Sequence, residues 1–411
     1  MSQTAPARSA PAAASARPGI SRGMTVLLAT ATGAIAANMY YAQPLLDVIA
    51  RSVGISAGAA GVLVTVTQLG FALGLVFVLP LADIVRRRSL LTVLLMLDAA
   101  ALAAVGAAPC PTVALVAFAA LGLANVAAQV LVPAAAHLAD DAHRGRTVAT
   151  VISGLLTGML LARTVAGIAT ELVGWRPLFL GAAALMVTLA MVLRRALHGM
   201  DALPGRRLGY GEVLRSTVRI YRTHAAVRVR AAYGALGFGA FSVFWSTAAL
   251  RLSRTPFDYP PAVIGLFGLL GAAGAIAANL TGRVRRHTHP LPTAFAVALI
   301  AVAFAVLLPA GDTLGGMIAG VLILDIGVQG LHVLNQRVIY DVDAEARNRV
   351  NSIYMTFDFV GGALGSAVAS LMWAQAGWPG VCLTGLGITA LASLLWICTS
   401  YRAGQAGAPV R

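Results

Sequence analysis

The segment from Asp140 to Arg176 decides how the chain is organised. It reads DDAHRGRTVATVISGLLTGMLLARTVAGIATELVGWR, a charged stretch followed by an apolar run and then Gly-Trp-Arg. Residues of this segment recur 203 positions later: Asp140 as Asp343, Arg144 as Arg347, Arg146 as Arg349, Gly158 as Gly361, Gly174 as Gly377 and Trp175 as Trp378. A fixed offset in a chain so poor in charge predicts two related halves, each with an equivalent charged loop.

The composition is that of a membrane protein. Apolar types make up 59% of the 411 residues and charged types only 11%. A soluble protein cannot bury so much apolar surface, whereas a bilayer accommodates it. We therefore predict an all-α integral membrane protein. The formal net charge of +15 comes from arginines between the apolar runs, which favours lipid headgroups over nucleic acid as partners.

Twelve apolar runs are long enough to span a bilayer, whose core of about 30 Å requires about 20 helical residues. They lie at 24–49, 57–80, 89–108, 112–136, 148–172, 177–195, 229–252, 261–282, 291–310, 313–336, 350–373 and 379–400. The predicted organisation is a disordered tail (1–23), a six-helix half (24–195), a middle loop (196–228), a pseudo-symmetric six-helix half (229–400) and a tail (401–411).

The arginines predict the orientation. They concentrate in the N-terminal tail and in the loops near residues 86, 144, 194–230, 284 and 347, whereas the opposite loops hold Arg51, Arg176, Arg251 and Arg254. By the positive-inside rule, both termini are cytoplasmic. In the middle loop, apolar residues from Tyr210 to Tyr221 fall at helical spacing. This predicts either a helix on the anionic inner surface or a plain linker between the halves.

Residues 81–88, LADIVRRR, carry a family resemblance. They resemble the cytoplasmic loop signature of the major facilitator superfamily, Gly-x-Leu-Ala-Asp-Arg-x-Gly-Arg-Arg; Leu81, Ala82, Asp83, Arg87 and Arg88 match, while Leu79, Ile84 and Arg86 differ. The resemblance implies a transporter that works by alternating access. It also implies a cytoplasmic gate formed by Asp83, Arg87 and Arg88 near the start of the eleventh helix. The alternative is that these arginines only set the topology.

Two further stretches resemble the drug/proton antiporter-like branch of bacterial transporters, NMYYAQPLL (38–46) and LLARTVAG (160–167). This implies export of small, partly apolar molecules across the bacterial inner membrane by a monomer driven by the proton gradient. The fifth helix lacks the proline of the antiporter pattern Gly-x-x-x-Gly-Pro-x-x-Gly and carries Arg163 instead. The alternative is therefore a proton symporter or facilitator for a metabolite such as an organic anion.

Other classes of function lack their motifs. The sequence contains no H-E-x-x-H and no P-loop, which argues against a membrane metalloprotease and against ATP coupling within this chain. A channel is disfavoured because channels rarely need a repeat of six helices with a latch-like loop. We therefore expect neither an enzyme nor a bound cofactor or metal.

The tenth span holds the densest polar cluster within the predicted membrane region. Asp325, Gln329, His332 and Gln336 follow at i, i+4, i+7 and i+11, which places them on one helix face. Loss of hydration at mid-bilayer favours the protonated form of a carboxyl group, as a proton carrier requires. Asp325 and His332 are thus predicted for proton coupling. A hydrogen-bonded helix–helix contact is the alternative.

The family fold implies a central cavity lined by helices 1, 4, 7 and 10. Polar and aromatic side chains on these helices predict its lining: Asn38, Tyr41, Gln43, Asn125, Gln129, Phe241, Trp245 and Gln329. Gln129 stands at the 203-residue offset from His332, as expected for a site at a pseudo-twofold interface. The aromatic residues could equally be packing groups. Asp98 is expected to pair with a neighbouring helix and Asp358 to lie near the gate loop.

Arg163 is predicted deep inside the fifth span. At 1.5 Å per residue it lies about 24 Å along that helix, in the outer half of the membrane. Its counterpart in the second half is Ser366, so the shared architecture does not require the charge. We predict that Arg163 faces protein and pairs with a carboxylate, a carbonyl or an anionic substrate group; the alternative is a side chain that snorkels to the surface. Gly154/Gly158 and Gly361/Gly365 predict close helix contacts on which the halves rock.

Overall fold

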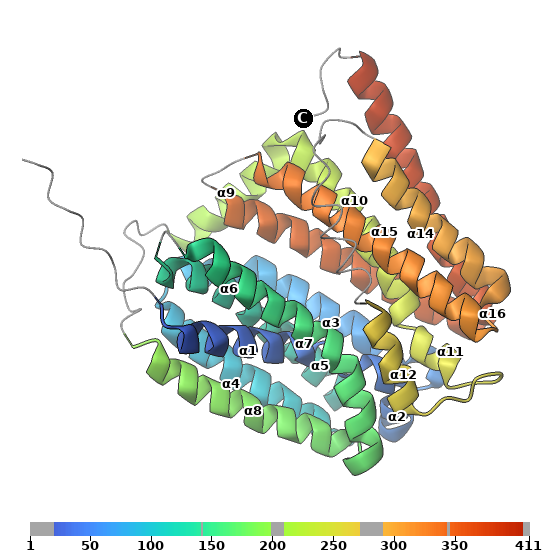
Figure 1. Ribbon diagram of the computed structural model, residues 1–411, viewed down its shortest axis with the longest axis horizontal. Coiled ribbons are helices and arrows are strands. Elements are labelled where there is room, and N and C mark those ends of the chain that lie inside the picture. Colours follow the sequence, from blue (N-terminus) through green and yellow to red (C-terminus); the bar gives the residue numbers. More distant parts are fainter. Residues whose placement is uncertain (1–19, 141–142, 199–208, 272–290, 343–345, 406–411) are drawn as a thin grey trace, which may run out of the picture.

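The computed structural model describes residues 20–140, 143–198, 209–271, 291–342 and 346–405, and regular structure within these ranges is helical throughout (Figure 1). The predictions for the disordered tail up to residue 19, for 199–208 of the middle loop, for the loop near residue 284 and for 406–411 lie outside these ranges.

The N-terminal half contains the helices coloured blue to green in Figure 1. In chain order they are α1 (Arg22–Asn38), η1 (Gln43–Leu45), α2 (Leu46–Val53), η2 (Ala57–Ala59), α3 (Val62–Leu73), η3 (Gly74–Val78), η4 (Leu79–Asp83), α4 (Arg87–Gly106), α5 (Pro111–Asn125), α6 (Ala127–Leu138), α7 (Arg144–Val173) and α8 (Trp175–Ala196). Pro44 stands at the start of η1, so the first span is broken where proline cannot donate a backbone hydrogen bond.

The C-terminal half follows a helix from the middle loop, α9 (Tyr210–Thr223). Its elements are α10 (Ala225–Trp245), α11 (Ala248–Leu252), α12 (Pro261–Phe267), η5 (Gly268–Gly271), α14 (Leu291–Ala310), α15 (Leu314–Tyr340) and α16 (Arg347–Gln405). The two halves lie side by side with their long helices running between the same two ends of the molecule (Figure 1).

The helices agree with the twelve predicted spans. In the described part of the chain, nine helices are long and apolar enough to cross a membrane, and the last, Arg347–Tyr401, is long enough for two spans because α16 is broken at Gly377. The first span is divided among α1, η1 and α2. The predicted eighth span begins with α12 and η5, and its residues 272–282 lie outside the described ranges. The prediction of an all-α membrane protein with two six-helix halves is thus confirmed.

The two glycine–tryptophan turns of the repeat are equivalent in the structure. Gly174 and Gly377 both have positive φ, of 90° and 61°, which glycine adopts without a steric penalty. Each turn reverses the chain between two long helices, and the tryptophan that follows is buried in its own half. The 203-residue offset therefore marks equivalent turns between the fifth and sixth and between the eleventh and twelfth spans.

Within each half, the predicted glycine pairs bring two helices into backbone contact. Gly154 and Gly158 of α7 pack against Ala29 and Gly33 of α1, with no room for a Cβ. The second pair, on α16, packs in the same way against Ala235 and Gly239 of α10. The expectation that the halves rock on these faces is wrong, because the contacts lie inside each half. They make each half rigid instead.

Other glycines bring the two halves together at one end of the molecule. We call the end with Asp83, Arg87 and Arg349 the arginine-rich end, and the end with Gly174 and Gly377 the opposite end. At the opposite end, Gly167 of α7 and Gly265 of α12 pack on backbone atoms of the other half. The Thr164 hydroxyl donates to the Gly265 carbonyl over 3.1 Å. We call this contact of α7 with α12 and η5 the glycine seal.

The second contact between the halves follows α3 and α16. Near the opposite end, the Ser366 hydroxyl donates to the Gly61 carbonyl over 3.0 Å. Near the arginine-rich end, the Ser352 hydroxyl donates to the Leu75 carbonyl over 3.0 Å. Between them, the Phe71 and Phe359 rings lie 4.3 Å apart. The second and eleventh spans are therefore in contact along most of their length.

The middle-loop helix α9 contacts both halves at the arginine-rich end. The Tyr210 hydroxyl donates to the Phe77 carbonyl of the N-terminal half over 2.8 Å, and Arg349 of the C-terminal half donates to the Ser216 hydroxyl over 2.7 Å. Val213 is buried, whereas Arg215, Arg219 and Arg222 are exposed. A helix in the middle loop is confirmed, with Val213 and Ile220 buried and Val218 exposed. Its place on the anionic inner surface stays a prediction.

Candidate central cavity

A cavity of about 1000 Å³ lies between the two halves. The N-terminal half contributes residues of α1, α3, α5, α6 and α7, and the C-terminal half contributes residues of α10, α15 and α16. These elements belong to the expected helices 1, 4, 7 and 10 together with helices 2, 5 and 11. A space formed by both halves changes shape when the halves move, as an alternating-access site requires.

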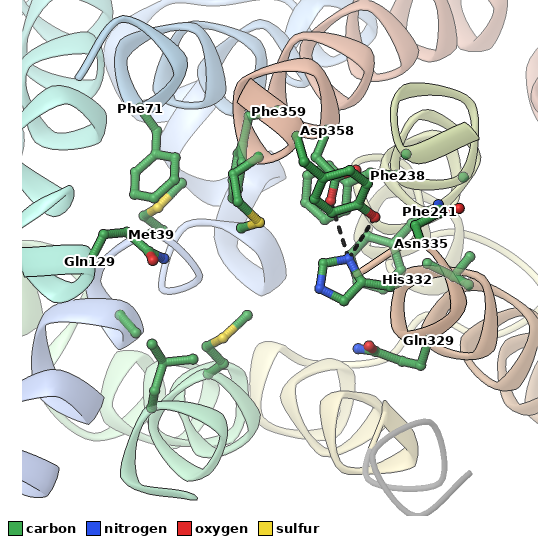
Figure 2. Close-up of a pocket in the computed structure, with 18 of the residues that line it drawn as sticks. Met39, Phe71, Gln129, Phe238, Phe241, Gln329, His332, Asn335, Asp358 and Phe359 are labelled. Carbon is green, nitrogen blue, oxygen red and sulfur yellow. Dashed lines mark hydrogen bonds and ion pairs between the residues drawn. The ribbon is translucent and has the colours of Figure 1, made fainter. Parts of the chain in front are cut away.

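Aromatic rings form one wall of the cavity. Phe238 and Phe241 of α10 stack with their centroids 5.4 Å apart, and Phe238 lies 4.9 Å from Phe359. Phe71 continues this wall into the other half (Figure 2). Met39, Met159 and Met355 also line the space. Flexible thioethers and aromatic faces adapt to partly apolar ligands of different shape.

A carboxylate and an imidazole meet in the cavity lining. Asp358 Oδ2 lies 3.3 Å from His332 Nδ1, and the Tyr354 hydroxyl lies 3.0 Å from the same nitrogen (Figure 2). Asp358 is buried and His332 is partly exposed. Asp358 Oδ1 packs against Gly234 and has no hydrogen-bond partner among the described residues. The pair thus places a carboxylate and an imidazole together in the cavity lining.

The amide residues predicted for the cavity differ in their positions, and three of them line it. Gln129 and Gln329 line it from opposite halves (Figure 2). Asn125 also contributes to the lining, but its amide group donates to the Ile35 carbonyl over 2.6 Å. Asn38 does not belong to the described lining. Its amide nitrogen instead donates to Asp98 Oδ2 over 2.8 Å. Asp98 thus pairs with a neighbouring helix, as expected.

The remaining residues predicted on helices 1 and 7 lie in three places. Phe241 lines the central cavity. Tyr41 packs edge-on against Phe179 of its own half, with the centroids 6.3 Å apart. Gln43 and Trp245 lie with Arg163 around a separate, smaller pocket near the glycine seal. The polar residues before Pro44 therefore do not form one site.

Arg163 is buried at the interface between the halves, with 6% of its surface exposed. Its Nε donates to Gln43 Oε1 over 2.7 Å, and its guanidinium lies 4.2 Å from the centroid of Trp245. The prediction that Arg163 faces protein is confirmed, and the snorkelling alternative is excluded. Asp325 is also buried, and its Oδ1 accepts a hydrogen bond from Trp245 Nε1 over 3.4 Å. Neither charged residue belongs to the described lining of the central cavity.

The gate residues lie beside the start of the eleventh helix, as the family resemblance implies. Asp83 and Arg87 line a second cavity of about 900 Å³ together with Arg349 and Ser352 of α16. Gln129 lines both cavities, so they adjoin. Arg88 instead donates to the Arg194 carbonyl over 2.7 Å, within the N-terminal half.

Comparison with known proteins identifies the family. The model of the Major Facilitator Superfamily matches residues 28–341. The chain belongs to this superfamily. It is 41% identical over 379 residues to the uncharacterized transporter YgaY of Escherichia coli O157:H7, which covers 92% of this chain and 95% of that one. It is 33% identical to the probable transporter SCO4007 of Streptomyces coelicolor, over 87% of this chain and 83% of that one.

The fold is shared with a solved bacterial structure. A bacterial homologue of the human lysosomal transporter Spinster, in an inward-facing and unoccupied conformation, superposes with a TM-score of 0.73. The identity is 11%, and the alignment covers 90% of this chain and 95% of that one. Together, the superfamily match and the relatives named as transporters show that this chain is a membrane transporter of a small molecule rather than an enzyme.

Further residues that the sequence did not reveal lie in or beside the cavity. Asp358 had been expected near the gate loop, yet it lines the central space with Tyr354, one turn away on α16. Arg230 of α10 donates to Asn335 Oδ1 over 3.4 Å and to the Thr293 hydroxyl over 3.1 Å. Tyr354 and Asp358 are four residues apart and so share one helix face, a spacing that could have indicated a polar face toward the cavity.

Proposed function

We propose that this transporter exports small, partly apolar molecules in exchange for protons. The observation that carries the proposal is the His332–Asp358 pair in an aromatic cavity between the halves. Asp358 is the one carboxylate among the described residues that line this space. A protonatable pair and an apolar wall in one cavity allow the proton and the substrate to occupy the site in turn.

The charge of the lining favours neutral or positively charged substrates. The described lining contains no arginine, whereas aromatic faces and a carboxylate attract cations. Arg163, the natural partner of an organic anion, lies outside this lining and is already held by Gln43 and Trp245. The alternative of an organic-anion symporter is therefore disfavoured, because Arg163 does not line the central cavity.

The decisive experiment measures transport in proteoliposomes with an imposed proton gradient, screened against a panel of neutral and cationic amphiphiles. We expect uptake of at least one compound into vesicles that are acidic inside, and proton release coupled to it. Substrate movement that is unaffected by the gradient would contradict proton exchange and would indicate a facilitator.

We further propose that the arginine-rich end and both termini face the cytoplasm of a bacterial inner membrane. The arginine asymmetry supports this orientation. His198 and Asp312 are exposed at the two ends of the molecule. Single cysteines in place of His198 and Asp312 should react with an impermeant maleimide only from inside and only from outside, respectively. Labelling of the cysteine at position 198 in intact cells would reverse the orientation.

A further inference from the structure

Two buried charges from different halves meet at one tryptophan. Arg163 belongs to α7 of the N-terminal half, and Asp325 belongs to α15 of the C-terminal half. The guanidinium lies over the Trp245 ring, and the indole Nε1 of the same residue donates to the carboxylate. The indole thus contacts both charged groups, one on its face and one at its Nε1 edge.

The surroundings of Arg163 do not neutralise its charge. Its contacts on the N-terminal side are the Gln43 amide oxygen and the Tyr40 ring, whose centroid lies 5.0 Å away. The Nη2 atom is buried without a hydrogen-bond partner among the described residues. A buried guanidinium with no countercharge is costly. Asp325 is the carboxylate that acts on it electrostatically, and it belongs to the other half.

The glycine seal covers this pair of charges. Gly268 packs against the Arg163 side chain and Gly271 against Asp325 Oδ2, both from η5. Gly265, one turn earlier, packs on the Arg163 carbonyl. The segment from Gly265 to Gly271 therefore contacts both charged residues while it closes the opposite end. Movement of α7 away from this segment would also separate Arg163 from Trp245 and Asp325.

We infer that Arg163, Trp245 and Asp325 form an interhalf charge lock that holds the opposite end of the transporter closed. The cation and the anion stabilise each other only while the two halves are in contact at the glycine seal. Arg163 and Trp245 act as positioning residues in this lock. The inference needs neither proton coupling nor a particular substrate, so it goes beyond the proposed function.

The test measures how fast a reagent enters the cavity from the side of the opposite end. Cys110, Cys382 and Cys398 are replaced, and a single cysteine is placed at Met159, which lines the cavity from α7. A membrane-impermeant methanethiosulfonate reagent is added from that side. We expect Arg163→Gln and Asp325→Asn each to raise the modification rate about tenfold, and the double variant to raise it no further, because either change breaks the same pair.

Controls separate loss of the lock from general loosening. Arg163→Lys keeps the charge and should raise the rate less than Arg163→Gln. Arg176→Gln removes an arginine of the same end that is bound within the N-terminal half by Ser52 and the Ala108 carbonyl, and it should leave the rate unchanged. Unchanged rates in both single variants would overturn the lock, as would effects that multiply in the double variant.

A further variant provides a test if Arg163→Gln and Asp325→Asn fail to insert into the membrane. Trp245→Phe keeps an aromatic ring over Arg163 but removes the Nε1 donor to Asp325. We expect a rise in the modification rate smaller than that of Arg163→Gln. A rate equal to that of the parent protein would show that the indole does not join the two charges, and would also overturn the inference.

Discussion

Two buried carboxylates of the C-terminal half, Asp358 and Asp325, have opposite surroundings. Asp358 faces the central cavity, and its partner His332 belongs to its own half, as does Tyr354, whose hydroxyl contacts the same imidazole nitrogen. Asp325 lies beside Trp245 and the glycine seal, and Arg163, which acts on it electrostatically, belongs to the other half. A charge balanced within one rigid half keeps its partner when the halves move, whereas a charge balanced across the interface loses it.

The strongest test of this difference compares Asp358→Asn with Asp325→Asn. Both variants are expected to lose gradient-driven transport in proteoliposomes down to background. Only Asp325→Asn should also raise modification of the cysteine at position 159, because only that residue contributes to the lock. The proposed difference between the two carboxylates is contradicted if Asp358→Asn also raises the modification rate, or if Asp358→Asn retains full proton-coupled transport.

Substitution of Arg163 tests the other side of the interface. Arg163→Ala should abolish transport, and Arg163→Lys should insert normally but lose most of it. The planar guanidinium stacks on Trp245 while its Nε donates to Gln43, and an ammonium group cannot do both. Initial rates in proteoliposomes, normalised to the amount of reconstituted protein, provide the measurement. Normal transport by both variants would restrict Arg163 to a packing role.

A smaller effect is expected at the arginine-rich end. Asp83→Asn should shift the resting population toward the state open at that end, because Asp83 lies beside the start of α16 in the second cavity. A shift of this kind needs only a few kcal/mol between states. A cysteine at Val132, in the same cavity, should become a few times more reactive toward an impermeant reagent added from that side. Unchanged reactivity would leave the loop as a determinant of topology alone.

The fold could be predicted because the sequence marks it directly. Apolar runs gave the spans, and the 203-residue offset gave equivalent turns at Gly174 and Gly377. The expectation for the glycine pairs failed for a physical reason. GxxxG spacing shows that a second helix approaches closely, but it does not say which one, so contacts inside each half were taken for contacts between the halves.

The candidate site was predicted less completely. Predicted polar residues on helices 4 and 10 and Phe241 on helix 7 line the cavity, whereas Asp358 is expected near the gate loop and Asn38 in the cavity. A membrane helix is apolar toward lipid and toward its neighbours, so hydropathy does not reveal which face meets the cavity. Arg163 pairs with Gln43, 120 positions away in the chain, and with Trp245 of the other half. Such partners depend on helix rotation, which spacing within one helix cannot show.

The glycine seal also has a consequence for energy conservation. Where Gly167 and Gly265 meet the other half, backbone lies on backbone with no room for a Cβ. A water molecule, roughly 2.8 Å across, is excluded from such a contact. Protons cross proteins by hopping along connected waters. We therefore expect this contact to block proton transfer at the opposite end while it is formed. For the proton exchange proposed above, such a barrier would keep protons from crossing the membrane without substrate.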